Sequence, residues 1–125
     1  MATSEAYRLG EVVVVPFPYT DRTSEKRRPA LVVSNARIHA FGYLWLAMIT
    51  SAPRDLLRFD HPIDDLAGAG LTAPSIVRPT KIACVEPSRI LRSVGRLAPD
   101  QVDSICAALR SFIGTATPPQ ERHSP

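Results

Sequence analysis

A run of cationic side chains ends a polar loop and stands directly before an apolar segment. Lys26, Arg27 and Arg28 precede Pro29, and residues 30–34 read Ala-Leu-Val-Val-Ser. A guanidinium held at the start of a core strand is fixed by the fold, and its planar fork of donors suits a phosphate better than a point charge does. The run therefore indicates phosphate chemistry with Arg28 as the leading residue, although a solvated surface pair is the commoner fate of adjacent charges.

Hydroxyl and imidazole groups are the next candidates for chemistry. Thr50 and Ser51 are adjacent hydroxyls at the end of an apolar run, where turn hydrogen bonding is the commoner role. Imidazoles titrate near neutrality, but the three histidines fall in a loop, a possible outer strand and the C-terminal tail. No converging acid–base pair is therefore expected from His39, His61 and His123.

Composition and charge narrow the class of protein. The net charge of +3 and the pI of about 9.2 give a mild bias toward polyanions such as nucleic acid. Cys84 and Cys106 show no CxxC spacing, so we expect reduced thiols in a cytoplasmic protein, with no zinc site and no disulfide framework. No stretch approaches the ~18 apolar residues of a membrane span.

Short β-branched segments dominate the chain, and one amphipathic helix follows them. Val102, Ile105, Leu109 and Phe112 repeat at helical spacing, and Pro99 suits a first helical position, which predicts a helix over residues 99–113. The β-branched and aromatic runs predict strands at residues 11–17, 30–34, 43–49, around 58–63, 75–78 and 81–85.

This order of elements predicts a mainly β fold with α. We expect a small, strongly bent antiparallel sheet or partly closed barrel with a C-terminal packing helix. We expect residues 10–114 to form one domain, with residues 1–9 as an N-terminal tail and residues 115–125 as a disordered C-terminal tail.

Two blocks near the N-terminus form a specific signature. Residues 10–21 read Gly-Glu-Val-Val-Val-Val-Pro-Phe-Pro-Tyr-Thr-Asp, and residues 26–34 read Lys-Arg-Arg-Pro-Ala-Leu-Val-Val-Ser. Residues 47–51, 70–81 and 94–97 add weaker matches in the same order. Together these segments resemble the MazF/PemK toxins of type II toxin–antitoxin systems. The resemblance implies an SH3-like or CcdB-like barrel, a homodimer, and cleavage of single-stranded RNA without metal or cofactor, held in check by a separately encoded antitoxin protein.

The resemblance maps the family's essential pair onto Arg28 and Thr50. Arg28 would clamp the phosphate oxygens while an RNA 2′-hydroxyl attacks phosphorus, and Thr50 would add a hydrogen bond that strengthens in the transition state. The family's loop glutamate falls on Thr23, so Glu25 is the nearest carboxylate for the base, with Asp21, water or the substrate left open. We also predict an RNA-binding set around this pair, which comprises Tyr19, Thr20, Lys26, Arg27, Ser51, Arg78 and Lys81.

Two alternatives to a nuclease remain open, and both act by binding without catalysis. A CcdB-like toxin would act by binding a topoisomerase, and its activity would depend on the end of the C-terminal helix rather than on Arg28. A catalytically degenerate member would only bind RNA or its partner, which the missing loop glutamate is consistent with. Fold alone does not separate these alternatives, because function resides in the site.

Overall fold

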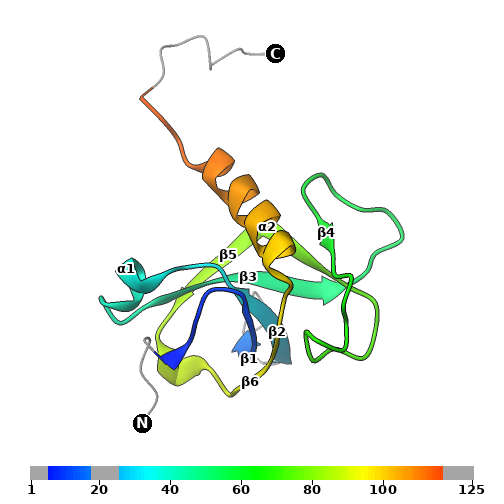
Figure 1. The fold of residues 1–125 in the computed structure, drawn as a ribbon, viewed down its shortest axis with the longest axis horizontal. Helices are drawn as coiled ribbons and strands as arrows, with labels where there is room; N and C mark the ends of the chain where they lie inside the picture. The colour runs from blue at the N-terminus through cyan, green and yellow to red at the C-terminus, as the bar shows by residue number, and fades with distance from the viewer. Residues whose placement is uncertain (1–5, 18–25, 117–125) are drawn as a thin grey trace.

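A curled, six-stranded antiparallel sheet forms the body of the protein (Figure 1). The computed structural model describes residues 6–17 and 26–116. Along the sheet the strands follow the order β4-β5-β3-β2-β1-β6. Their bounds are β1 Glu11–Phe17, β2 Lys26–Val32, β3 Leu44–Ser51, β4 His61–Pro62, β5 Ser75–Val85 and β6 Arg92–Arg96. The helices are α1 Ala36–His39, the 3₁₀ turn η2 Pro87–Arg89 and α2 Pro99–Phe112. The predicted fold class is confirmed.

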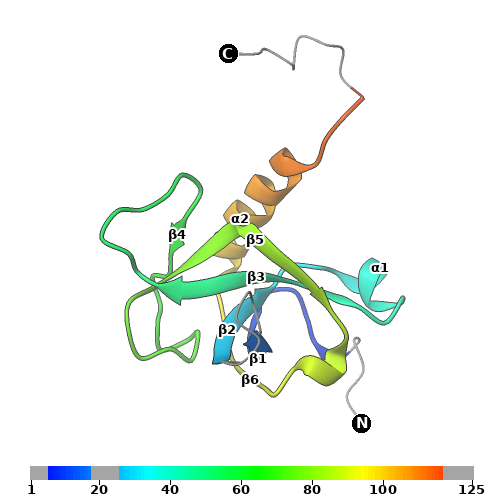
Figure 2. The ribbon, with the colours of Figure 1, turned by 180° about the vertical axis from the view of Figure 1, so that it is seen from behind.

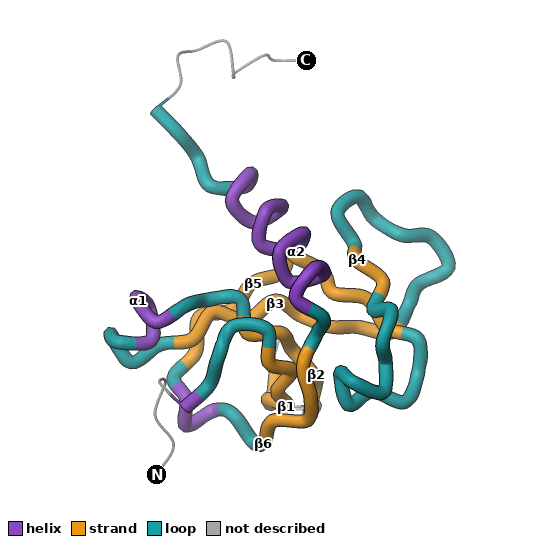
Figure 3. The backbone as a smooth tube through the Cα atoms, in the orientation of Figure 1, coloured by secondary structure: helices purple, strands orange, loops and turns teal. Residues whose placement is uncertain are grey.

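Two apolar clusters cover opposite faces of this sheet, because side chains alternate along each strand. The helix-side cluster joins Val12 of β1 to Val102 and Ile105 of α2. The far-side cluster takes Val13 and Val15 from the same strand. The four consecutive valines of β1 are therefore buried on both faces, as the lack of alternation predicts. Figure 3 shows α2 over one side of the sheet, with its C-terminal end pointing away.

Strand β2 begins earlier than predicted, and this moves the cationic run into the sheet. The expected start was Ala30, but β2 begins at Lys26. Arg28, Arg27 and Lys26 pair with residues of β1 in a continuous antiparallel register. The edge of β1 pairs with a segment whose own composition favours a loop, so tertiary pairing overrides local propensity.

Strand β5 is continuous where two short strands were expected. Its register against β3 steps from Ala47↔Ile82 to Met48↔Arg78, so residues 79–81 form a bulge. Pro79 lies in this bulge, where its missing N–H removes no bond from the ladder. Figure 2 shows β5 changing direction midway along its length.

The predicted strand around residues 58–63 was too long, because only His61 and Pro62 are in β4. The segment before it turns instead, since the Asp60 N–H bonds the Leu57 carbonyl at 3.1 Å. Strand β6 was not expected, and it pairs with β1 at the other edge of the sheet. Within the described part of the chain, no helix is long and apolar enough to cross a membrane.

Candidate nucleic-acid interface

Arg28 lies on the far-side face of the sheet, and Arg27 does not. Arg28 pairs with Val15, a member of the far-side cluster, and partners in an antiparallel ladder point to the same face. Its side chain is half-buried, and its Nε atom is fully buried. Arg27 and Lys26 are exposed, and alternation turns Arg27 to the opposite face. The two adjacent guanidiniums therefore lie on opposite faces of the sheet and differ in burial.

Thr50 stands on the same face as Arg28 at the next strand. The pair Ala30↔Met48 is the last in the ladder of β2 with β3. Carrying that register two residues further sets Arg28 at the level of Thr50, although Pro29 lacks the N–H to extend the ladder. Thr50 is half-buried and pairs with Ile76 on its other side. The sheet thus brings the two predicted catalytic residues to one face and one level.

Arg78 joins this face from β5, and its guanidinium is held by Asp60. Arg78 pairs with Met48, a member of the far-side cluster, so it lies diagonal to Thr50. Its Nε donates to Asp60 Oδ1 at 3.0 Å and its Nη2 to Asp60 Oδ2 at 2.9 Å. Side-chain hydrogen bonding to Arg78 lowers the pKa of Asp60, and the same bond raises the pKa of Arg78. The residue predicted to contact RNA is therefore also half of an ion pair.

Asp60 is the residue that the sequence analysis did not single out. It lies 18 residues before Arg78, and no local pattern connects the two. The hairpin of β4 and β5 brings them together. The available signal was a single carboxylate placed between the aromatic Phe59 and the short strand β4, which is too common to be specific.

The remaining predicted residues are spread more widely. Ser51 is exposed at the end of β3 and alternates to the face opposite Thr50. Lys81 is exposed in the bulge of β5. Tyr19, Thr20 and Glu25 lie outside the described residues, so the structure gives no position for the candidate base or the candidate stacking ring.

The histidines do not form a catalytic pair among the described residues. His39 is buried at the end of α1, where its Nε2 shares a hydrogen bond of 2.8 Å with Ser34 Oγ. Burial lowers the pKa of His39, so the neutral imidazole is favoured. His61 Nδ1 donates to the Phe59 carbonyl at 2.7 Å. His123 lies outside the described residues, which contain no cluster of potential metal ligands.

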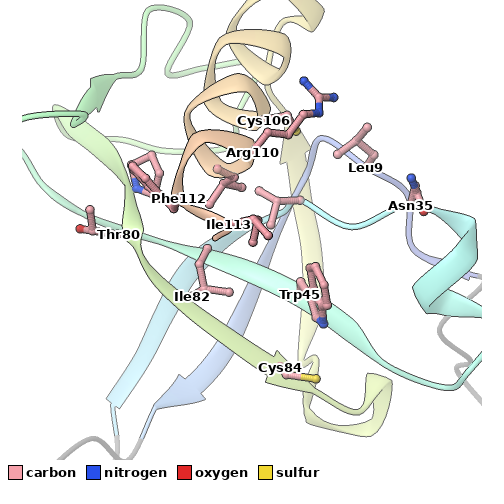
Figure 4. Close-up of a pocket in the computed structure, with 13 residues that line it drawn as sticks. Leu9, Asn35, Trp45, Thr80, Ile82, Cys84, Cys106, Arg110, Phe112 and Ile113 are labelled. Carbon is pink, nitrogen blue, oxygen red and sulfur yellow. The ribbon is translucent and has the colours of Figure 1, made fainter. Parts of the chain in front are cut away.

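A separate apolar groove of about 690 Å³ lies between the end of α2 and the strands β3 and β5. Figure 4 shows Trp45 and Ile82 on the strands, with Phe112 and Ile113 at the end of the helix above them. The side chains of Trp45, Ile82 and Ile113 are 40%, 44% and 67% exposed. The helix does not cover this part of its own sheet face, and the groove contains no residue of the Arg28 face.

Comparison with known proteins assigns this chain to a family. The family model described as PemK-like, MazF-like toxin of type II toxin–antitoxin system matches residues 8–113. The chain therefore belongs to the PemK/MazF toxin family, as the sequence blocks predicted.

Solved structures show the same fold at low sequence identity. Mycobacterium tuberculosis toxin MazF-mt6 is 22% identical with a TM-score of 0.64, over 81% of this chain and 93% of that chain. A MazE–MazF complex from Deinococcus radiodurans is 20% identical with a TM-score of 0.68, over 85% and 94%. A mycobacterial endoribonuclease in complex with its cognate antitoxin is 13% identical with a TM-score of 0.64, over 87% and 99%. Among curated proteins, none matches.

Proposed function

We propose that this toxin is an endoribonuclease that cleaves single-stranded RNA in the cytoplasm and so inhibits growth. The observation that carries the proposal is the placement of Arg28 and Thr50 on one sheet face at one level of the register. A half-buried guanidinium beside a hydroxyl suits a phosphate whose charge grows during reaction. Family membership supports the same assignment, and a solved relative carries the description endoribonuclease.

The proposed reaction is transesterification within the RNA strand. The 2′-oxygen attacks the adjacent phosphorus, the bond from phosphorus to the 5′-oxygen breaks, and the products are a 2′,3′-cyclic phosphate and a 5′-hydroxyl. Arg28 stabilises the nonbridging oxygens of the phosphorane, and the Thr50 hydroxyl donates a further hydrogen bond. Glu25 is the candidate to accept the proton of the 2′-hydroxyl, and the leaving 5′-oxygen takes up one proton from water.

The test is a cleavage assay on a long single-stranded RNA with EDTA present, followed by mapping of the fragment ends. Discrete cuts with 5′-hydroxyl and 2′,3′-cyclic phosphate ends are expected, because no metal-bound nucleophile takes part in the proposed reaction. Ends that carry a 5′-phosphate, or cuts that require added metal, would contradict the mechanism. Absence of cuts from the folded protein would favour a toxin that acts only by binding.

The proposal includes two protein partners. One solved relative is described as an endoribonuclease in complex with its cognate antitoxin, and we propose that a cognate antitoxin likewise blocks this chain. An acidic segment of such a partner would be attracted to Lys26, Arg27 and Arg28 and would exclude RNA from them. Purified antitoxin, once its open reading frame is identified, should compete with RNA for the wild-type chain.

The second partner is another copy of the same chain. We propose that the homodimer covers the groove of Trp45, Ile82 and Ile113, because a two-fold contact places the same apolar patch of each copy against the other. Light scattering should give twice the chain mass for the wild type and the single chain mass for Ile82→Glu. Leu57→Glu introduces the same charge at an exposed leucine outside the groove and should remain a dimer.

A further inference from the structure

Asp60 is a buried carboxylate that fixes the partly exposed guanidinium of Arg78 next to the candidate RNA face. Its side chain is only 1% exposed, whereas that of Arg78 is 20% exposed. Both carboxylate oxygens bond Arg78, and Oδ2 also accepts the Leu57 N–H at 2.8 Å. A carboxylate taken out of water is costly unless it is paired and hydrogen-bonded, and here both conditions are met.

The turn that presents Asp60 is itself held from both sides. Phe59 adopts a left-handed backbone conformation with φ of 75°, which is strained for a bulky residue. Its carbonyl accepts from His61, and its ring packs edge-on against Phe112 of α2 with centroids 4.9 Å apart. These contacts hold the turn in a conformation that its own sequence does not favour, and they deliver the carboxylate to Arg78.

The orientation of the ion pair leaves one side of the guanidinium for another acceptor. The bonds to Asp60 use Nε and Nη2 of Arg78, and no bond from Nη1 is found within the described part of the chain. Arg78 lies on the face of Arg28 and Thr50, diagonal to Thr50 across the ladder. Diagonal neighbours are about 7 to 8 Å apart, which is within reach of long side chains.

We propose that Asp60 is a positioning residue. It orients Arg78 so that Nη1 of Arg78 binds an RNA phosphate next to the phosphate bound by Arg28. This inference rests on the proposed ribonuclease function and adds to it a second phosphate contact with its own supporting carboxylate. Asp60 itself does not touch the RNA. It acts through the orientation of Arg78, and loss of that orientation lowers both binding and turnover.

The sign of one substitution separates this role from simple electrostatics. Asp60→Asn removes one negative charge near a polyanion site, so charge alone predicts tighter RNA binding. Loss of positioning predicts the opposite, with kcat/KM lower by between about 10-fold and 10²-fold. Asp64→Asn makes the same charge change at an exposed residue whose carboxylate makes no bond within the described residues, and kcat/KM should stay within about twofold.

The experiment measures cleavage of one long single-stranded RNA and binding of a 2′-O-methyl oligonucleotide that spans its main cut site. The methyl group removes the nucleophile, so binding is measured without reaction. The set comprises wild type, Asp60→Asn, Asp64→Asn, Arg78→Gln and the double variant Asp60→Asn/Arg78→Gln. Urea unfolding curves first establish that each variant is folded under the conditions of the assay. Weaker binding by Asp60→Asn and equal activities of Arg78→Gln and the double variant are expected, because Asp60 has nothing left to position.

The outcomes are distinguishable. A wild type that cleaves while Asp60→Asn binds as tightly or more tightly overturns the positioning role alone, and so does a further loss in the double variant. A wild type that neither binds nor cleaves overturns the proposed function together with this inference. If Asp60→Asn does not fold, Arg78→Lys replaces it. That variant keeps the charge but loses the fork, so the same loss of binding is expected, and wild-type binding would refute the proposal.

Discussion

Replacement of Thr50 by valine tests the proposed hydrogen bond without disturbing the sheet. Valine keeps the β-branched shape that suits the end of β3, and the pairing of residue 50 with Ile76 is a backbone feature that remains. The free energy of unfolding should therefore change by no more than about 0.5 kcal/mol. One preorganised donor to a developing oxyanion is worth about 3 kcal/mol, so the cleavage rate should fall about 10²-fold.

Serine at position 50 provides the matched control, because it keeps the hydroxyl and loses the methyl group. A fully buried methyl group contributes about 0.8 kcal/mol, and Thr50 is only half-buried, so Thr50→Ser should lose a fraction of that stability. The two variants should rank in opposite orders: valine is the more stable in urea, and serine is the more active in single-turnover cleavage. A valine variant with the wild-type rate, or equal losses in both variants, would refute the role of the hydroxyl.

Two further predictions concern stability. Burial lowers the pKa of His39 below 6.5, so the unfolded chain binds a proton that the folded chain does not, and urea melts should show stability falling from pH 7 to pH 5. The lowered pKa of Asp60 affects the free energy of unfolding only near and below pH 3.8. His39→Gln should therefore flatten the dependence of stability on pH between pH 7 and pH 5. Gly70 and Gly42 both have positive φ, but a Cβ at Gly70 would meet the Val94 carbonyl, whereas a Cβ at Gly42 meets nothing within 4 Å. Gly70→Ala should therefore cost about 2 kcal/mol more than Gly42→Ala in urea, and equal costs would refute the close packing of this turn on β6.

Local sequence pattern was sufficient to predict the strands and helices whose own residues show a clear apolar run or periodicity. The valine run of β1 and the helical spacing of Val102 and Ile105 predicted a strand and a helix whose burial the fold confirms. Strand β6 carries no such signal, because Arg92–Arg96 contains one apolar side chain and pairs only through the edge that β1 offers. Pro79 was expected to separate two strands, and a bulge accommodates it instead.

The residues of the candidate site also differ in how far local sequence could predict them. Arg28 was predicted as a site residue from its place beside Pro29 and from the family blocks, both of which are contiguous in sequence. Asp60 was not found, because its relation to Arg78 depends on a hairpin whose strand β4 is only two residues long. The hydrogen bonds between Asp60 and Arg78 across this hairpin correspond to no periodic pattern in the sequence.

The most direct measurement compares Arg28→Ala with Arg27→Ala in cleavage of single-stranded RNA. Both substitutions remove one positive charge from adjacent residues of β2, but only Arg28 shares a face with Thr50. Arg28→Ala should lower the cleavage rate by at least about 10²-fold in a chain that remains folded. Arg27→Ala should retain cleavage, with weaker binding and a shallower salt dependence. Equal losses in the two variants, or cleavage retained by folded Arg28→Ala, would contradict the assignment of this face as the catalytic site.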